Sequence, residues 1–185
     1  MKDNVTLETA SIETIDATGI QTSKGHHDLD VIAYATGFET TGWRWSVDVQ
    51  GRSGQHLNEV WKDYPEAYLG ITVTDFPNLF VLYGPNTNLG HNAITFMLER
   101  QVEYAVKALD GLGETGKAAM VPTKDAQDRF NAQVQADLEK TVWADPACNS
   151  WYKNEHGKIT QNWSSHTRDY AAAVADVKLE DYELI

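Results

Sequence analysis

The 185-residue sequence predicts an α/β fold, and three observations lead to that prediction. Two continuous apolar runs end in glycine, which is the pattern of strands buried on both faces. Amphipathic helical segments follow the second run. Short alternating apolar segments, broken by turn residues, precede the first run. The length is sufficient for one compact domain with its own core.

The N-terminal part of the chain, residues 5–25, predicts short antiparallel strands joined by tight turns. Its apolar residues alternate over short distances, and the pairs Thr18-Gly19 and Lys24-Gly25 supply the turns. A buried strand is then expected over residues 30–37, because the run Val31-Ile32-Ala33-Tyr34-Ala35 leaves no polar face.

Two further segments complete the expected sheet region. Residues 38–74 are rich in tryptophan and glycine and show no sustained period, so they predict a loop with short elements. A second buried strand is expected over residues 79–85, after the turn-forming residues 75–78.

Helical periodicity appears twice in the second half of the chain. Gly111 and Gly113 are expected to end the first helix, and Pro146 the second, for which Thr123 is the expected N-cap. The apolar stripe of the first helix consists of Ile94, Met97, Leu98, Val102, Ala105 and Leu109. The stripe of the second consists of Ala126, Phe130, Val134, Leu138 and Val142.

Three short elements are expected besides these helices. Residues 119–121 predict a short strand, residues 169–176 a short helix, and residues 182–184 a terminal strand.

Charge and composition exclude several classes of partner. Fifteen basic and 27 acidic residues give a net charge of −12, which repels nucleic acid and anionic membranes. No apolar run is long enough to span a bilayer, and the first residues contain no apolar signal core, so a cytoplasmic location is expected. The single cysteine, Cys148, rules out an intramolecular disulfide and a cysteine-cluster metal site.

Two apparent motifs are better explained without a ligand. Residues 111–117 fit G-x-G-x-x-G and most of a P-loop, but both motifs need a buried strand before them, and a helix precedes these glycines. His26 and His27 precede Asp28, yet adjacent strand residues point to opposite faces, which favours a solvated turn over a metal site. No metal is therefore expected. No nucleophile–base set is recognisable either, so no catalytic residue is assigned, and Cys148 is interpreted as a bystander.

The ends of the two expected strands are the candidate ligand surface. Ligands of open α/β sheets bind beyond the carboxyl ends of the strands. Thr36-Gly37 and the segment 84–90 lie at those ends, and glycine lets the backbone approach a ligand closely. The helix that begins near residue 91 offers free N–H groups. Ordinary strand-to-helix turns are the alternative interpretation.

The same segments carry a family resemblance. Residues 30–38 resemble the "D-x-[IV]-[IV]-x-A-T-G-[FY]" segment of flavin-containing and Baeyer–Villiger monooxygenases, and residues 68–80 resemble their "Y-x-G-x-x-x-x-x-F-P-N-L-F". Residues 84–91, 101–104 and 148–152 continue the likeness, which spans about residues 5–170.

The resemblance implies an enzyme that reduces bound FAD with NADPH. An oxygen atom from O2 is then inserted beside a ketone carbonyl or transferred to a heteroatom such as the sulfur of a sulfide. Trp151 corresponds to an aromatic residue near the nicotinamide cofactor and the substrate. The residues that the resemblance places against the flavin are Thr36, Gly37, Gly84, Pro85, Asn86, Thr87, Asn88 and Leu89.

The family's other motifs are not in this sequence. By the resemblance, both glycine-rich fingerprints and the arginine that stabilises the flavin peroxide belong upstream of the residues present here. The "F-x-G-x-x-x-H" signature is absent. We therefore expect a C-terminal portion of the enzyme, which is inactive alone, retains no FAD or NADPH, and self-associates. Residues 1–110 are expected to be the last part of a Rossmann-like FAD-binding domain. Residues 111–185 would form a helical and loop extension packed on that part, in one structural unit.

Two other functions remain open at this point. The first is a non-catalytic binding or interaction module derived from a flavoprotein tail. The second is a small intact enzyme with another chemistry, which the missing nucleophile and acid–base set argues against.

Overall fold

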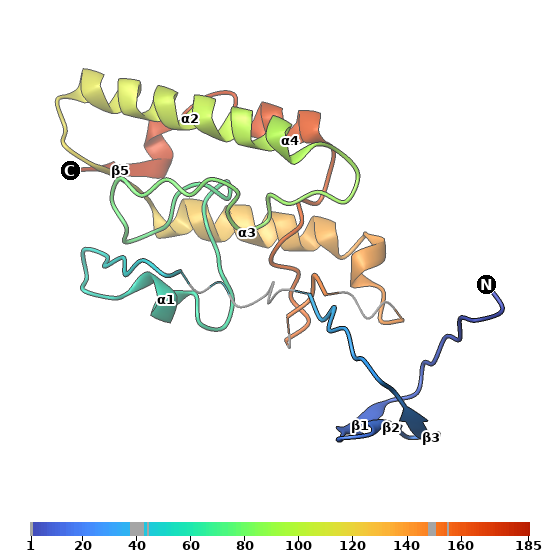
Figure 1. The fold of residues 1–185 in the computed structure, drawn as a ribbon. Coiled ribbons are helices and arrows are strands. Elements are labelled where there is room, and N and C mark those ends of the chain that lie inside the picture. The colour runs from blue at the N-terminus through green and yellow to red at the C-terminus, as the bar shows by residue number, and fades with distance from the viewer. Residues whose placement is uncertain (1, 38–42, 44, 148–150, 155) are drawn as a thin grey trace. The chain divides into compact units, whose positions relative to one another are not determined.

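The computed structural model describes residues 2–37, 43, 45–147, 151–154 and 156–185. The chain divides into two compact units, Met1–Phe38 and Glu39–Ile185, and each is described by itself. Together they contain short antiparallel strands and helices, so the α/β class is confirmed (Figure 1).

The first unit contains a three-stranded antiparallel meander. Strands β1 (Ile12–Ile15), β2 (Gly19–Thr22) and β3 (Gly25–Asp28) pair in the order β1-β2-β3. The side chain of Asp16 accepts a hydrogen bond from the backbone N–H of Thr18, at 2.7 Å, and thereby closes the first turn. The predicted antiparallel strands and tight turns are confirmed.

Two expectations for this unit are wrong. Residues 31–37 form no strand, and Val31 and Tyr34 are 82% and 71% exposed. A buried strand needs neighbours on both sides, and among the described residues β1–β3 pair only with one another. His26 and His27 lie within β3 and not in a turn. No group of His, Cys, Asp and Glu suited to a metal ion occurs among the described residues.

The second unit is built around two long helices. Helix α2 (Ile94–Thr115) and helix α3 (Lys124–Leu138) are joined by strand β4 (Met120–Pro122), which pairs antiparallel with the C-terminal strand β5 (Tyr182–Leu184). The smaller elements are α1 (Leu57–Val60), η1 (Val142–Ala144), α4 (Thr167–Ala173) and η2 (Leu179–Asp181).

The core of this unit has two clusters. The larger cluster joins α2, α3 and α4 with the turn around residues 68–72, which lies between the two long helices in Figure 1. The smaller cluster lies under α1 and consists of Leu57, Trp61, Ala67, Val73, Phe76 and Val81. No helix within the described ranges is both long enough and apolar enough to cross a membrane.

Helix α2 differs from its prediction at the C-terminus. It continues through Gly111 and Gly113 to Thr115, and Gly116, with φ of 70°, is the C-cap. A glycine inside a helix costs only about 1 kcal/mol, whereas the left-handed cap position strongly favours glycine. Residues 111–115 are therefore helical and the turn follows at Gly116, so these glycines follow a helix and not the strand that a phosphate loop requires.

The buried face of α2 is also rotated from the predicted stripe. Val102 and Leu109 are 45% and 51% exposed, although both belong to the predicted face. Hydrophobic periodicity misses this rotation because one buried residue is polar. The buried row consists of Met97, Gln101, Tyr104, Ala108 and Leu112.

Helix α3 begins as predicted. The Thr123 hydroxyl accepts a hydrogen bond from the Ala126 N–H at 3.2 Å, which satisfies a free donor of the first turn. The helix ends at Leu138, well before Pro146, and Val142 lies 70% exposed in η1. The short helix and the two short strands of the C-terminal half occur within three residues of their predicted positions.

Residues 79–85 do not form the predicted second strand. Phe80 makes one isolated bridge to Thr72, and the Val81 N–H donates to the Ile71 carbonyl at 2.7 Å. The chain then turns sharply, with Tyr83 at a φ of 59°. As with residues 31–37, the apolar content predicts a strand, but the described residues offer no ladder that such a strand could join.

Candidate functional site

The segment 84–90 is held by a second, extended segment, residues 159–163. The backbone N–H groups of Asn86 and Asn88 donate to the carbonyls of Thr160 and Gln161, at 2.9 and 2.8 Å. Asn88 also forms a parallel bridge with Asn162. Two segments more than 70 residues apart in sequence are thus paired like strands, and the backbone of the loop is fixed.

The buried side chains of this loop point into its own support. Asn86 is 1% exposed and donates to the carbonyls of Ile159 and Asn162, at 2.9 and 3.0 Å. Thr87 is fully buried and donates to the Gly84 carbonyl at 2.7 Å. These side chains are engaged in shaping the loop, so the backbone is the part that can face a ligand.

The turn that contains Gly70 packs directly against residues 84–87 of the loop. Gly70 has a φ of 68°, and a Cβ atom there would lie 2.2 Å from Thr87 Cγ2 and 2.6 Å from the Pro85 carbonyl oxygen. A Cβ atom on Gly84 would lie 2.2 Å from the Gly70 carbonyl oxygen. Both glycines allow two backbone segments to touch.

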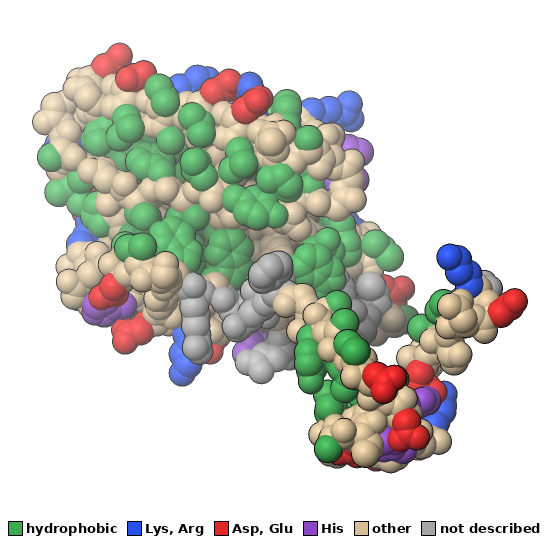
Figure 2. Space-filling view, in the orientation of Figure 1, with side chains coloured by type: hydrophobic (Ala, Val, Ile, Leu, Met, Phe, Trp, Pro, Cys, Tyr) green, Lys and Arg blue, Asp and Glu red, His purple; other side chains and the backbone are tan. Residues whose placement is uncertain are grey.

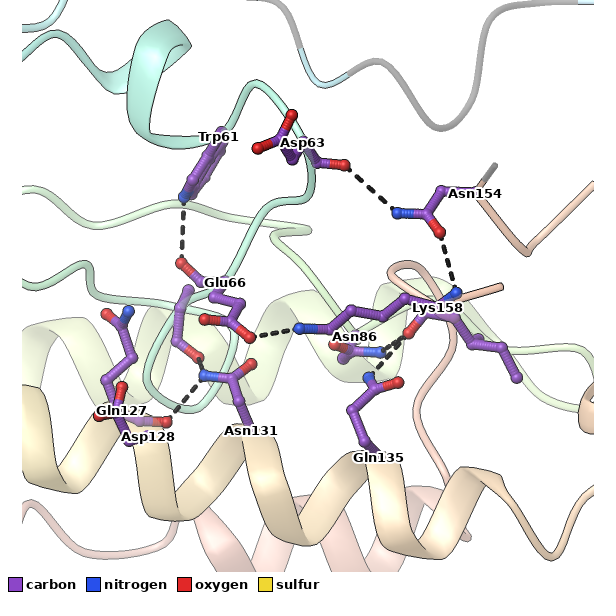
Figure 3. A network of polar contacts seen from close by, with 12 residues as sticks. Trp61, Asp63, Glu66, Asn86, Gln127, Asp128, Asn131, Gln135, Asn154 and Lys158 are labelled. Carbon is purple, nitrogen blue, oxygen red and sulfur yellow. Dashed lines mark hydrogen bonds and ion pairs between the residues drawn. The ribbon is translucent and has the colours of Figure 1, made fainter. Parts of the chain in front are cut away.

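Polar side chains of α3 complete the support from below (Figure 3). Gln135 donates to the Ile159 carbonyl at 2.9 Å, and Asn131 donates to the Ala67 carbonyl at 3.2 Å. Lys158 forms an ion pair with Glu66. The extended segment that holds the loop is therefore itself tied to a rigid helix.

Aromatic side chains lie beside the loop. The Tyr83 hydroxyl donates to Asn88 Oδ1 at 2.8 Å. Burial, and to a smaller extent the charge of Tyr152, raises the pKa of Tyr83 above its usual value. Tyr152 packs against Trp151, with ring centroids 4.5 Å apart, and edge-on against Trp143 at 5.9 Å. Trp151 is 59% exposed and Tyr83 is 43% exposed. Exposed aromatic faces beside a rigid loop suit a planar or apolar ligand.

Other buried tyrosines of this unit have a structural role. The Tyr68 hydroxyl donates to Asp181 Oδ2 at 2.6 Å, and the Tyr104 and Tyr182 hydroxyls are 2.8 Å apart. Burial is the main cause that raises the pKa of Tyr68 and of Tyr104. These groups stay protonated, so they serve as neutral hydrogen-bonding groups in the core.

No protein-family model matches the chain. It is 40% identical to the FAD-binding monooxygenase ktnD of Aspergillus niger over 185 residues, which are 98% of this chain and 30% of that protein. It is 34% identical to a Baeyer–Villiger monooxygenase of Pseudomonas aeruginosa over 183 residues, 98% of this chain and 35% of the relative. The chain is part of a protein like the Baeyer–Villiger monooxygenases. It spans about a third of the length of these curated relatives.

Solved structures of monooxygenases show the same likeness. An oxidised steroid monooxygenase bound to NADP matches with a TM-score of 0.80 and 27% identity. The match covers all of this chain and 36% of that one. Every candidate residue named above therefore lies within the matched region.

The candidate site residues of this Baeyer–Villiger monooxygenase-like chain fall into two groups. Residues 84–89 and Trp151 lie in the second unit, where Tyr83 bonds to Asn88 and Tyr152 packs against Trp151. Thr36 and Gly37 lie exposed in the first unit. Phe38 of the first family segment and residues 148–150 of the last, including Cys148, are outside the described residues.

Sequence reasoning missed two buried polar residues of this unit. Asn162 and Gln101 are fully buried polar residues with no apolar pattern to mark them. For Gln101 a signal existed, because it begins the family-like segment 101–104. Asn162 has no comparable signal.

Proposed function

We propose that the complete protein is an FAD- and NADPH-dependent monooxygenase of the Baeyer–Villiger type. It inserts one oxygen atom of O2 beside a ketone carbonyl, or transfers it to a heteroatom, and the second oxygen atom leaves as water. The observation that supports this most is that the firmly held 84–89 loop and the exposed Trp151 belong to one unit of a chain 34% identical to a Baeyer–Villiger monooxygenase.

The residues present fit the ring side of a flavin site. The backbone of residues 84–89 would lie along the ring, and the family resemblance assigns Thr36 and Gly37 to FAD binding as well. Gly37 has a φ of 76°, and no atom of the described residues lies within 4 Å of a Cβ atom added there, so its backbone could approach a ligand. When bound, FAD supplies the redox and oxygen-transfer chemistry, and NADPH supplies the hydride.

The protein's own contribution is binding, orientation and exclusion of water. Buried Asn86 and Thr87 keep the loop in one shape, so a ring that packs on it is held in one place. Trp151 would stack on the nicotinamide and shield the reacting atoms from water. Residues 1–110 would then complete a Rossmann-like FAD-binding domain, with residues 111–185 packed on it.

The names of the relatives are consistent with this proposal. The Aspergillus niger protein is an FAD-binding monooxygenase, the Pseudomonas aeruginosa protein is a Baeyer–Villiger monooxygenase, and the steroid monooxygenase binds NADP. The activity of this protein and its choice between ketones and heteroatoms are inferences from that likeness.

The direct test is product analysis with the complete protein. It should convert a panel of ketones or sulfides to esters, lactones or sulfoxides in the presence of NADPH and isotopically labelled O2. One labelled oxygen atom per product molecule is expected. NADPH oxidation without any oxygenated product, across the whole panel, would refute the proposal.

A further inference from the structure

One buried polar side chain on α2 has contacts unlike those of its neighbours. Gln101 is fully buried and lies in the inward row of the helix between Met97 and Tyr104. Burial of an amide is unfavourable unless its polar atoms form hydrogen bonds. The partners of Gln101 therefore indicate why it is there.

The amide of Gln101 joins three separate segments. Its Oε1 accepts from the Tyr83 backbone N–H at 2.8 Å, and its Nε2 donates to the Tyr170 hydroxyl of α4 at 2.9 Å. The Tyr170 hydroxyl in turn donates to the Leu69 carbonyl at 2.9 Å. One side chain thus links the residue before the 84–89 loop to α4 and, through it, to the turn behind the loop.

The two residues whose backbones end this series of hydrogen bonds have an unfavourable conformation. Leu69 and Tyr83 have φ values of 58° and 59°. Residues with a Cβ atom keep that left-handed conformation only where their surroundings impose it. Tyr83 also bonds Asn88 through its hydroxyl. It therefore restrains both ends of the loop, and Gln101 restrains Tyr83.

We propose that Gln101 is the positioning residue of the flavin-side loop and acts through the backbone N–H of Tyr83. The inference rests on the proposed function, because the loop is assigned to the flavin there. Glutamine suits the task, since one planar group must accept from an N–H and donate to a hydroxyl. An ionised carboxylate lacks the donor, and an apolar side chain lacks both groups.

The first test measures amide hydrogen exchange in the 185-residue chain. Gln101→Met is similar in length and removes both bonds. Tyr104→Phe is the matched control, because it removes a buried hydroxyl bonded to Tyr182 from the same face of α2. Exchange at the Tyr83 amide should rise roughly five- to tenfold more in Gln101→Met than in the control. Unchanged protection at Tyr83 would overturn the inference.

The second test measures FAD dissociation from the complete protein by flavin fluorescence. Gln101→Met should release FAD faster than Tyr104→Phe. Equal release from both variants, despite faster exchange at Tyr83, would overturn the link between Gln101 and the cofactor. A complete wild-type protein that binds no flavin would instead refute the proposed function, and the exchange measurement would still decide whether Gln101 holds the loop.

A third variant provides the rescue. In Gln101→Glu a neutral carboxyl group can accept from the Tyr83 N–H and donate to the Tyr170 hydroxyl, as the amide does. Burial disfavours its ionised form. Protection at Tyr83, corrected for intrinsic exchange, should therefore be near wild type at low pH and fall as the pH rises. Protection that does not return at low pH would contradict the inference.

Discussion

Single residues of the candidate site divide into those that shape it and those that face outward. Asn86 and Thr87 are buried and bonded within the loop, whereas Trp151 is 59% exposed. Only the outward group can touch a ligand without a rearrangement of the fold. Substitutions in the two groups should therefore have separate effects on stability and on function.

Trp151→Ala in the complete enzyme should leave FAD bound and reduce turnover with NADPH or change the substrate preference. Because the side chain is more than half exposed, its loss should cost well under the roughly 3–5 kcal/mol of a core tryptophan. Steady-state kinetics and thermal melting measure the two effects. Trp163→Ala, at a tryptophan only 8% exposed, is the control that should lose stability. Loss of the melting transition or of flavin in the Trp151 variant, before its kinetics change, would make Trp151 structural.

Gly70→Ala should destabilise the chain by more than about 2 kcal/mol. The new methyl group would sit at a positive φ and overlap Thr87 and the Pro85 carbonyl. Gly113→Ala, in α2 with no atom within 4 Å of the added Cβ, should stabilise the chain by roughly 0.5–1 kcal/mol. Urea denaturation measures both. A neutral Gly70 variant would show that the loop is not packed against this turn.

Secondary-structure elements were predictable where their signals are local. The meander, the N-cap of α3 and the β4–β5 strands follow from turn residues, a capping threonine and short apolar runs. Residues 31–37 and 79–85 carry strand composition, but a strand requires partners distant in sequence, and composition cannot supply them. The predicted buried face of α2 differs from the observed one because a hydrophobic pattern does not mark the buried, polar Gln101.

The same reasoning explains how much of the site was predictable. The family-like segments located residues 84–89 and Trp151, and both lie in one unit. The support from residues 159–163 was not predictable, because the pairing joins residues about 70 positions apart through backbone atoms that every sequence has.

At the scale of one helix, Thr123→Ala should destabilise the chain by about 1 kcal/mol, since the Ala126 N–H loses its acceptor. Helical circular dichroism during thermal unfolding measures the loss. Thr123→Ser keeps the hydroxyl and should stay close to wild type. Equal stability of the two variants would contradict the assigned N-cap.

At the scale of the whole molecule, helix α2 of the second unit exposes several apolar side chains. Val102, Val106 and Leu109 are 45%, 52% and 51% exposed, and Figure 2 shows hydrophobic side chains spread over the face of this unit that is turned to the viewer. Such surface favours association. The net charge of −12 opposes it, and salt screens that repulsion.

The isolated chain should therefore self-associate, and more strongly at high salt. Sedimentation velocity over a range of concentrations measures this. Replacement of Val102 and Leu109 by lysine should shift the chain to monomer. A wild-type chain that stays monomeric at high concentration and high salt would contradict the prediction and favour a self-contained interaction module.

The central claim is that this chain is one part of a flavin site whose other part it does not contain. Absorbance spectra of the complete protein and of the isolated 185-residue chain test that claim most directly. The complete protein should carry one flavin per chain, bleached by NADPH without oxygen, and the isolated chain should be colourless because the diphosphate of FAD needs a glycine-rich fingerprint. A folded complete protein without flavin, or an isolated chain with stoichiometric flavin, would contradict the account.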